Sequence, residues 1–140
     1  MLSQQQKQDI LEFGVMHIVT QGGPAWDEWE GVCRYYNDED GSHCFIGAML
    51  DKDLCRKFDA DEDGVSAGEI VERGINRWSG EHDETFLTEL QKAHDLAASD
   101  AYDNPRESDE KKMGVFFECF SRRIEWVCSK FCLRYPEELI

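Results

Sequence analysis

Residues 111–134 read KKMGVFFECFSRRIEWVCSKFCLR and form the most apolar stretch of the chain. The apolar residues recur at helical spacing and cover a stripe wider than one helix face. They are Val115, Phe116, Phe117, Phe120, Ile124, Val127, Cys128 and Phe131. Such a helix either lies at the centre of the fold or buries its second face against another copy of the chain. We expect the central position, and a homodimer through this C-terminal helix is the alternative.

Segments of the same periodicity come earlier in the chain. Residues 4–20 predict a first helix that the Gly-Gly-Pro at 22–24 ends, and the pattern turns helical again after Gly47. Residues 67–78 follow a Ser-Ala-Gly-Glu capping box at 66–69, and residues 84–98 predict a further helix. The polar residues 99–110 contain Pro105 and predict an exposed, flexible loop.

A β-hairpin is predicted over residues 32–46. Val-Cys-Arg-Tyr-Tyr at 32–36 and Ser-His-Cys-Phe-Ile at 42–46 flank the turn Asn-Asp-Glu-Asp-Gly at 37–41. The fold class expected is therefore α+β and predominantly helical, with about five helices around one small antiparallel β-hairpin, in a single domain over residues 1–140. The pairing would place Cys33 opposite Cys44, which we interpret as small buried thiols while leaving their redox state open.

The charge of the chain restricts its partners. Thirty Asp and Glu oppose fifteen Lys and Arg, which gives a formal charge of −15. A field of this sign repels nucleic acid and anionic membranes and attracts basic surfaces. The N-terminus is too polar for a signal peptide, and no apolar run reaches the length of a membrane span. We expect a cytoplasmic protein that contacts neither nucleic acid directly nor a membrane.

A calcium loop is the first metal hypothesis. Asp59-Ala60-Asp61-Glu62-Asp63-Gly64 matches the opening of an EF-hand loop, with Asp59, Asp61 and Asp63 as the oxygen ligands. The position of the bidentate Glu holds Ile70, and no second loop follows. A solvated acidic loop is therefore the favoured interpretation, and calcium is the alternative.

The sequence gives less support to a zinc site or a catalytic site than to the calcium loop. Zinc ligands could be drawn from Cys33, His43, Cys44, Cys128 and Cys132, but no Cys-x-x-Cys pair occurs. His82-Asp83 and His94-Asp95 are adjacent pairs, and neighbours on a helix point about 100° apart, so we expect no hydrogen bond within either pair. We expect His94 and His17 to be core or boundary histidines. The sequence thus predicts no enzyme and no cofactor.

Two rows of carboxylates remain as the candidate binding surface. Held on helices and a tight loop, such rows can imitate the charge spacing of a nucleic-acid backbone and occupy a basic cleft. The alternative interpretation is an ordinary acidic surface that contacts only solvent. The rows comprise Asp59, Asp61, Glu62, Asp63, Glu69 and Glu72, and then Glu81, Asp83, Glu84, Glu89 and Asp95.

The chain contains the pattern Cys33-Arg-Tyr-Tyr, a turn ending at Gly41, and Cys44-Phe-Ile-Gly. This pattern resembles the Cys-x-Tyr-Arg…Gly…Cys-Ala-Ile-Gly core of a family of small phage and prophage proteins of unknown function. Phe86-Leu-x-x-Leu-Gln-x-Ala-His-Asp is similar to its Phe-Leu-x-x-Leu-Gln-x-Ala-His-Asp helix, and His17 with Gln21 echoes its first helix. The loop at 59–64 and the segment at 99–110 are departures, and the final helix is Phe- and Cys-rich where relatives are Trp-rich.

The resemblance implies a viral origin and transfers no functional residue. Together with the charge, it leads us to expect a phage accessory protein that works without catalysis in the host cytoplasm. Such a protein would bind and inhibit a host protein with a basic surface, as anti-restriction and anti-CRISPR inhibitors do by imitating nucleic acid. The competing class is a calcium-dependent binding module.

Overall fold

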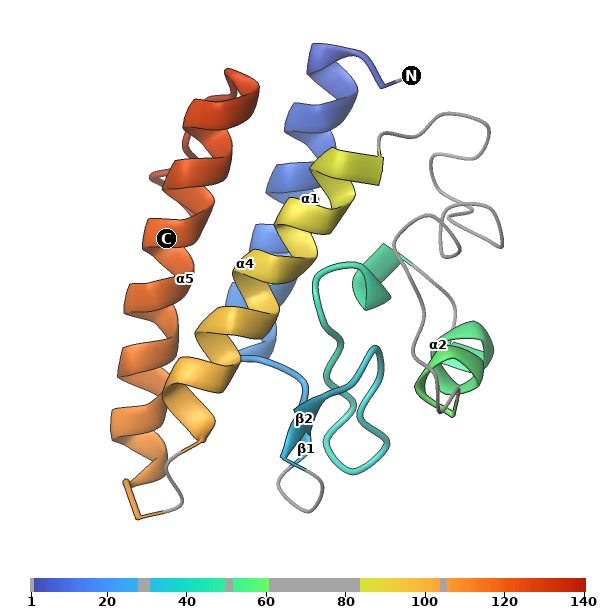
Figure 1. Ribbon diagram of the computed structural model, residues 1–140, viewed down its shortest axis with the longest axis vertical. Coiled ribbons are helices and arrows are strands. Elements are labelled where there is room, and N and C mark those ends of the chain that lie inside the picture. The colour runs from blue at the N-terminus through green and yellow to red at the C-terminus, as the bar shows by residue number, and fades with distance from the viewer. Residues whose placement is uncertain (1, 28–30, 50–51, 61–83, 104–105) are drawn as a thin grey trace.

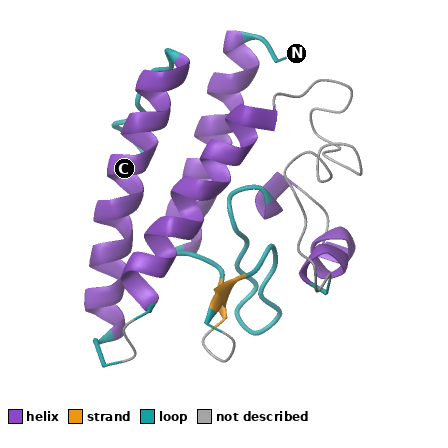
Figure 2. Cartoon of the chain, viewed as in Figure 1, coloured by secondary structure: helices purple, strands orange, loops and turns teal. Residues whose placement is uncertain are grey.

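The computed structural model describes residues 2–27, 31–49, 52–60, 84–103 and 106–140. Three long helices lie side by side: α1 (Gln4–Gln21), α4 (Glu84–Tyr102) and α5 (Asp109–Phe131) (Figure 1). The short elements lie beside this bundle: β1 (Trp26–Asp27), β2 (Val32–Cys33), the 3-10 helix η1 (Gly47–Met49) and α2 (Lys52–Asp59). Figure 2 shows how helix predominates among the described residues, as the sequence predicts.

Local capping explains where the long helices begin and end. The Ser3 side chain accepts the backbone N–H of Gln6, whose side chain accepts the N–H of Ser3, so a capping box starts α1. Gly22 ends α1 in the left-handed conformation, at φ 86°. Ser108 caps α5 by accepting the N–H of Lys111.

The core lies between the three long helices. Ile10, Leu11, Val15 and Ile18 of α1 are buried against apolar residues of α4 and α5. In α5 the stacked rings of Phe116 and Phe120, whose centroids are 5.4 Å apart, are buried. Besides Lys112, which the prediction did not include, the buried positions belong to the predicted stripe: Phe116, Phe120, Ile124, Val127 and Cys128. The C-terminal helix therefore contributes a full face to the core, as expected.

The outer face of α5 keeps some apolar surface. Trp126 is 53% exposed, and Lys130 places its ammonium group 5.0 Å from the centroid of the Trp126 ring. Because Lys130 covers part of this ring, Trp126 is an amphipathic surface position. A homodimer through this helix stays a prediction.

The predicted hairpin over residues 32–46 is wrong. β2 pairs antiparallel with β1, Trp26 opposite Cys33, and not with residues 42–46. Across the turn at 37–41 a single bridge joins Tyr36 to His43, beside two backbone bonds from the amides of Asn37 and Cys44 to the carbonyls of Ser42 and Tyr35. The ladder goes no further because the Tyr35 amide, which would pair with Cys44, donates to the Asp59 carboxylate of α2 instead.

Helix number and lengths also differ from the prediction. The described residues form four α-helices, whereas about five were expected, and the expected helix at 67–78 lies outside them. α4 continues to Tyr102 and α5 begins at Asp109, so most of the expected loop at 99–110 is helical or capping. No helix in the described ranges has the length and apolar character that crossing a membrane would require.

Candidate binding pocket

A turn carrying three acidic residues is held by hydrogen bonds of its own. We call residues 37–41 the acidic turn. The Asn37 side chain accepts the N–H of Glu39, and the Asn37 carbonyl accepts the N–H of Gly41, which takes a positive φ of 74°. The Asp40 carboxylate accepts both the N–H and the hydroxyl of Ser42, at 2.9 and 2.6 Å. These bonds fix the backbone that carries the carboxylates.

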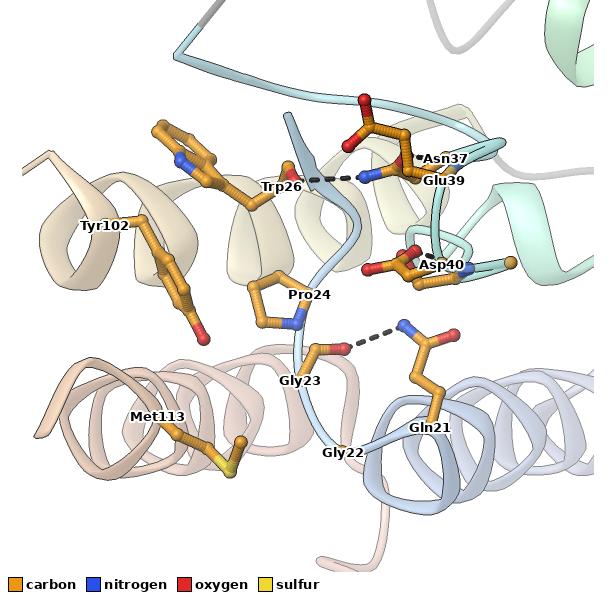
Figure 3. A pocket seen from close by; sticks show the side chains of 12 residues that line it. Gln21, Gly22, Gly23, Pro24, Trp26, Asn37, Glu39, Asp40, Tyr102 and Met113 are labelled. Atoms are coloured by element: carbon orange, nitrogen blue, oxygen red, sulfur yellow. Dashed lines mark hydrogen bonds between the residues drawn. The ribbon is translucent and has the colours of Figure 1, made fainter. Parts of the chain in front are cut away.

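A cavity of about 520 Å³ lies between this acidic turn and the ends of the long helices. Figure 3 shows Trp26, Tyr102 and Met113 on one side of it, and Glu39 and Asp40 on the other. The apolar side is built from β1, the last residue of α4 and the first turns of α5. The cavity therefore joins segments that are far apart in the sequence.

Three side-chain hydrogen bonds hold the walls in place. Gln21, the last residue of α1, donates from its side chain to the Gly23 carbonyl at 2.7 Å and to the His43 carbonyl at 2.6 Å. Asn37 donates from its side chain to the Trp26 carbonyl at 3.1 Å (Figure 3). The acidic turn is thus tied to β1, so the carboxylates and the aromatic wall form one unit.

The aromatic wall already contacts a cation from within the chain. The rings of Trp26 and Tyr102 have centroids 5.9 Å apart, and the ammonium group of the buried Lys112 lies 5.9 Å from the Tyr102 centroid. A positive charge near an aromatic face is attracted by the ring quadrupole. The wall is therefore compatible with cationic groups.

Asp38 of the acidic turn and the nearby Asp27 are paired within the molecule. A second hollow of about 450 Å³ contains Asp38, whose carboxylate accepts Arg56 at 2.7 Å, and Asp27, whose carboxylate accepts Arg34 at 3.1 Å. Within the described chain, the Glu39 carboxylate has no such arginine partner. Glu39 is therefore the carboxylate best placed to receive a cation from outside.

Most residues of the predicted carboxylate rows lie outside the described part of the chain. Asp61, Glu62, Asp63, Glu69, Glu72, Glu81 and Asp83 lie outside the described residues, and the Glu84 side chain is not described. Glu89 is described: its carboxylate lies 3.7 Å from Lys130 and its side chain is 18% exposed. Glu89 thus serves an ion pair within the molecule.

Asp59 has an internal role in the described structure. Its two carboxylate oxygens accept the backbone amides of Tyr35 and Tyr36, at 2.9 and 3.2 Å. Burial raises the pKa of this carboxyl group against the opposing effect of those two bonds. Asp61 and Asp63, the other calcium candidates, lie outside the described residues, so the calcium hypothesis remains a prediction.

His94 is a core histidine, as expected, with no exposed surface. One prediction about it is wrong: its Nδ1 lies 2.9 Å from the Asp95 carboxylate, although the two residues are adjacent on α4. The side chains converge because rotation about χ1 and χ2 overcomes the angle between their Cα–Cβ bonds. His17 is partly buried, and burial lowers its pKa.

Sequence reasoning missed the pocket itself. It treated the residues at 37–41 only as the turn of a hairpin. The available signal was the run Asp38-Glu39-Asp40 in a tight turn, with a tryptophan nearby in the sequence. The chain matches no protein-family model, no curated protein and no solved structure.

Proposed function

We propose that the protein is a non-catalytic acidic binding protein whose partner presents a basic surface. The observation that carries the proposal is the pocket of Figure 3, where Glu39 and Asp40 face Trp26 and Tyr102 across one cavity. In this proposal the pocket receives an arginine or lysine side chain of the partner. The formal charge of −15 supports the same choice of partner.

The two walls recognise different parts of a cationic side chain. A guanidinium group can stack on an indole or phenol ring and donate hydrogen bonds to a carboxylate through its edge. Charge-assisted bonds of this kind are shorter and stronger than neutral ones. Because the acidic turn is fixed by its own hydrogen bonds, little ordering of Glu39 and Asp40 is required when the cation binds.

Long-range charge would bring the partner to the pocket. A strongly negative surface accelerates encounters with a basic protein, and the acceleration falls as salt screens the field. Electrostatic attraction then accounts for the rate of association, and the pocket accounts for its specificity. The expected signature is an association rate that falls steeply with ionic strength.

The resemblance to phage proteins supports a host protein as the partner. A basic surface in a host cell commonly serves to bind nucleic acid, so an acidic protein of this kind would inhibit by occupying that surface in the host cytoplasm. In this proposal the acidic residues of the rows at 59–72 and 81–89 that face solvent extend the contact around the pocket. Asp59 and Glu89 already serve contacts within the chain and add little to it.

A pair of short peptides tests the pocket. A peptide carrying one arginine is expected to shift the NMR signals of the Trp26 indole and the Tyr102 ring, whereas the same peptide with citrulline is not. Citrulline has nearly the shape of arginine but no charge, so the comparison isolates the cation. Equal shifts with both peptides, or shifts only at other residues, would contradict the proposal.

A substitution in the acidic turn provides the matched control. Glu39→Gln is expected to weaken binding of the arginine peptide about 3- to 10-fold, which corresponds to the roughly 1 kcal/mol of a partly exposed ion pair. Glu137→Gln removes an exposed carboxylate that lines no part of the pocket and should leave binding nearly unchanged. If both variants lose affinity equally, only net charge matters and the pocket has no specific role.

A further inference from the structure

A second group of chemically active side chains lies away from the pocket, where β2 meets α4. The sulfur of Cys33, one ring nitrogen of His94 and a carboxylate oxygen of Asp95 all lie within 4.8 Å of one another. Cys33 comes from β2, and the other two residues are neighbours on α4. Of the five zinc ligands considered from the sequence, only Cys33 belongs to this group.

We propose that Cys33, His94 and Asp95 bind a zinc ion. Thiolate, imidazole and carboxylate are the three ligand types that zinc takes in proteins. Around a tetrahedral zinc, with bonds of about 2.0–2.3 Å, such ligand atoms lie about 3.4–3.6 Å apart. The His94 Nδ1–Asp95 distance of 2.9 Å would lengthen by about 0.5 Å, and separations as long as 4.8 Å would shorten by about 1.2–1.4 Å, both by side-chain rotation.

His94 presents one ring nitrogen to the group. The ring is fully buried, its Nδ1 contacts Asp95, and its Nε2 has no hydrogen-bond partner among the described residues. Zinc bound between Nδ1 and Asp95 would replace the single hydrogen bond of this nitrogen and leave the proton on Nε2, which is the neutral form of imidazole that ligates metals.

The surroundings of the group suit a metal site. Gln91 donates from its side chain to the Asp95 carboxylate at 2.8 Å, and the Ile46 amide holds the Gln91 oxygen at 3.0 Å. Hydrogen bonds of this kind orient ligating carboxylates in known metal sites. Asp95 is also 43% exposed at its side chain, which gives an ion a route to the buried histidine.

The ligand types select zinc over calcium or magnesium. Hard divalent cations prefer a shell of oxygen atoms, whereas a thiolate and an imidazole favour zinc and related transition metals. Three protein ligands leave a fourth position, which a water molecule would occupy.

Zinc and cobalt titrations of the reduced, chelator-treated full chain test the proposal. We expect one zinc ion per chain, a higher melting midpoint with zinc than with chelator, and a cobalt(II) spectrum that contains a thiolate charge-transfer band. Each ion should release the thiol proton as the sulfur binds. Failure of the wild-type chain to bind zinc stoichiometrically would overturn the proposal.

Three variants locate the site. Cys33→Ser is expected to remove the charge-transfer band and to weaken zinc binding about 100-fold or more, because loss of even an outer-shell partner costs 10- to 100-fold. Cys132→Ser, which changes an exposed thiol at the end of α5, should bind zinc like the wild type. Unchanged binding in Cys33→Ser, or loss of binding in Cys132→Ser alone, would overturn the assignment.

Asp95→Asn tests the same site independently, in case Cys33→Ser does not fold. Its side chain is partly exposed, so the fold should tolerate the change, and the loss of one carboxylate ligand should weaken zinc binding at least 10-fold. Circular dichroism of each variant in chelator verifies that the fold is intact before zinc is added. A folded Asp95→Asn chain with wild-type zinc affinity would contradict the role of Asp95.

Discussion

Gly14→Ala is expected to lower the free energy of unfolding by about 2–3 kcal/mol, although alanine is the better helix former. Gly14 lies in the middle of α1, and a Cβ atom added there would overlap the ring of Phe45. The ring cannot move aside easily, because Phe45 is fully buried and packs against Phe120 with centroids 6.4 Å apart. Overpacking of this kind forces shifts in both helix and core.

The same substitution elsewhere in the chain is the control. Gly114 lies within α5, is exposed, and has no atom within 4 Å of an added Cβ. Gly114→Ala should therefore gain only the helix propensity of alanine and stabilise the chain by about 0.5–1 kcal/mol. Urea unfolding of both variants measures the two effects. A stabilised Gly14→Ala chain would show that α1 and Phe45 are not in contact.

A double substitution identifies the cause of the Gly14 effect. Phe45→Ala alone should cost about 3–5 kcal/mol, because it leaves a cavity in the core. In that background Gly14→Ala no longer meets a ring and should be neutral or stabilising. The difference between the two backgrounds is the coupling energy of residues in contact. Additive effects would place the strain of Gly14→Ala somewhere other than at Phe45.

The helical part of the fold was predictable because its determinants are local. The buried positions of α1 and α5 repeat at helical spacing, and serine caps or glycine stops mark several of the ends. Phe116 and Phe120 lie on the stripe that the spacing defines and are buried. The observed end of α4 at Tyr102 lies beyond the predicted end, because the polar composition of its last turn is typical of a loop.

The strands and the pocket depend on contacts that local patterns do not contain. The aromatic and β-branched residues at 32–36 have the composition of a strand, but their amides are taken by Asp59 from a helix later in the chain. The pocket requires Tyr102 and Met113, at the end of one helix and the start of another, to meet Trp26. The packing of the helix bundle, and no local sequence pattern, brings these three side chains to one cavity.

Asp59→Ala is expected to destabilise the chain by about 2 kcal/mol at neutral pH. The substitution leaves the amides of Tyr35 and Tyr36 without their acceptor in a partly buried position. An unpaired amide costs about 1–3 kcal/mol where it is fully shielded from water, and less where water reaches it. Removal of a desolvated carboxylate from the last residue of α2, where the helix dipole disfavours it, offsets part of this loss.

An exposed aspartate of the same helix provides the comparison. The side chain of Asp53 is 96% exposed, and its contact with Arg56 is long, at 3.5 Å. Asp53→Ala should change the free energy of unfolding by no more than about 0.5 kcal/mol. If Asp59→Ala is equally mild, its carboxylate does not hold residues 35–36 against α2.

The pH dependence of this difference follows from the direction of the pKa shift. Burial raises the pKa of Asp59 above its ordinary value of 3.8, so the native state binds the proton more readily than the unfolded state. The stabilisation contributed by Asp59 is then fully present below 3.8 and decreases as the pH rises through the raised pKa. The stability gap between the wild type and Asp59→Ala should therefore be larger at about pH 3 than at about pH 7. Urea titrations at several pH values measure that gap, and a gap that widens with pH would mean that the two amides stabilise the carboxylate more than burial disfavours it.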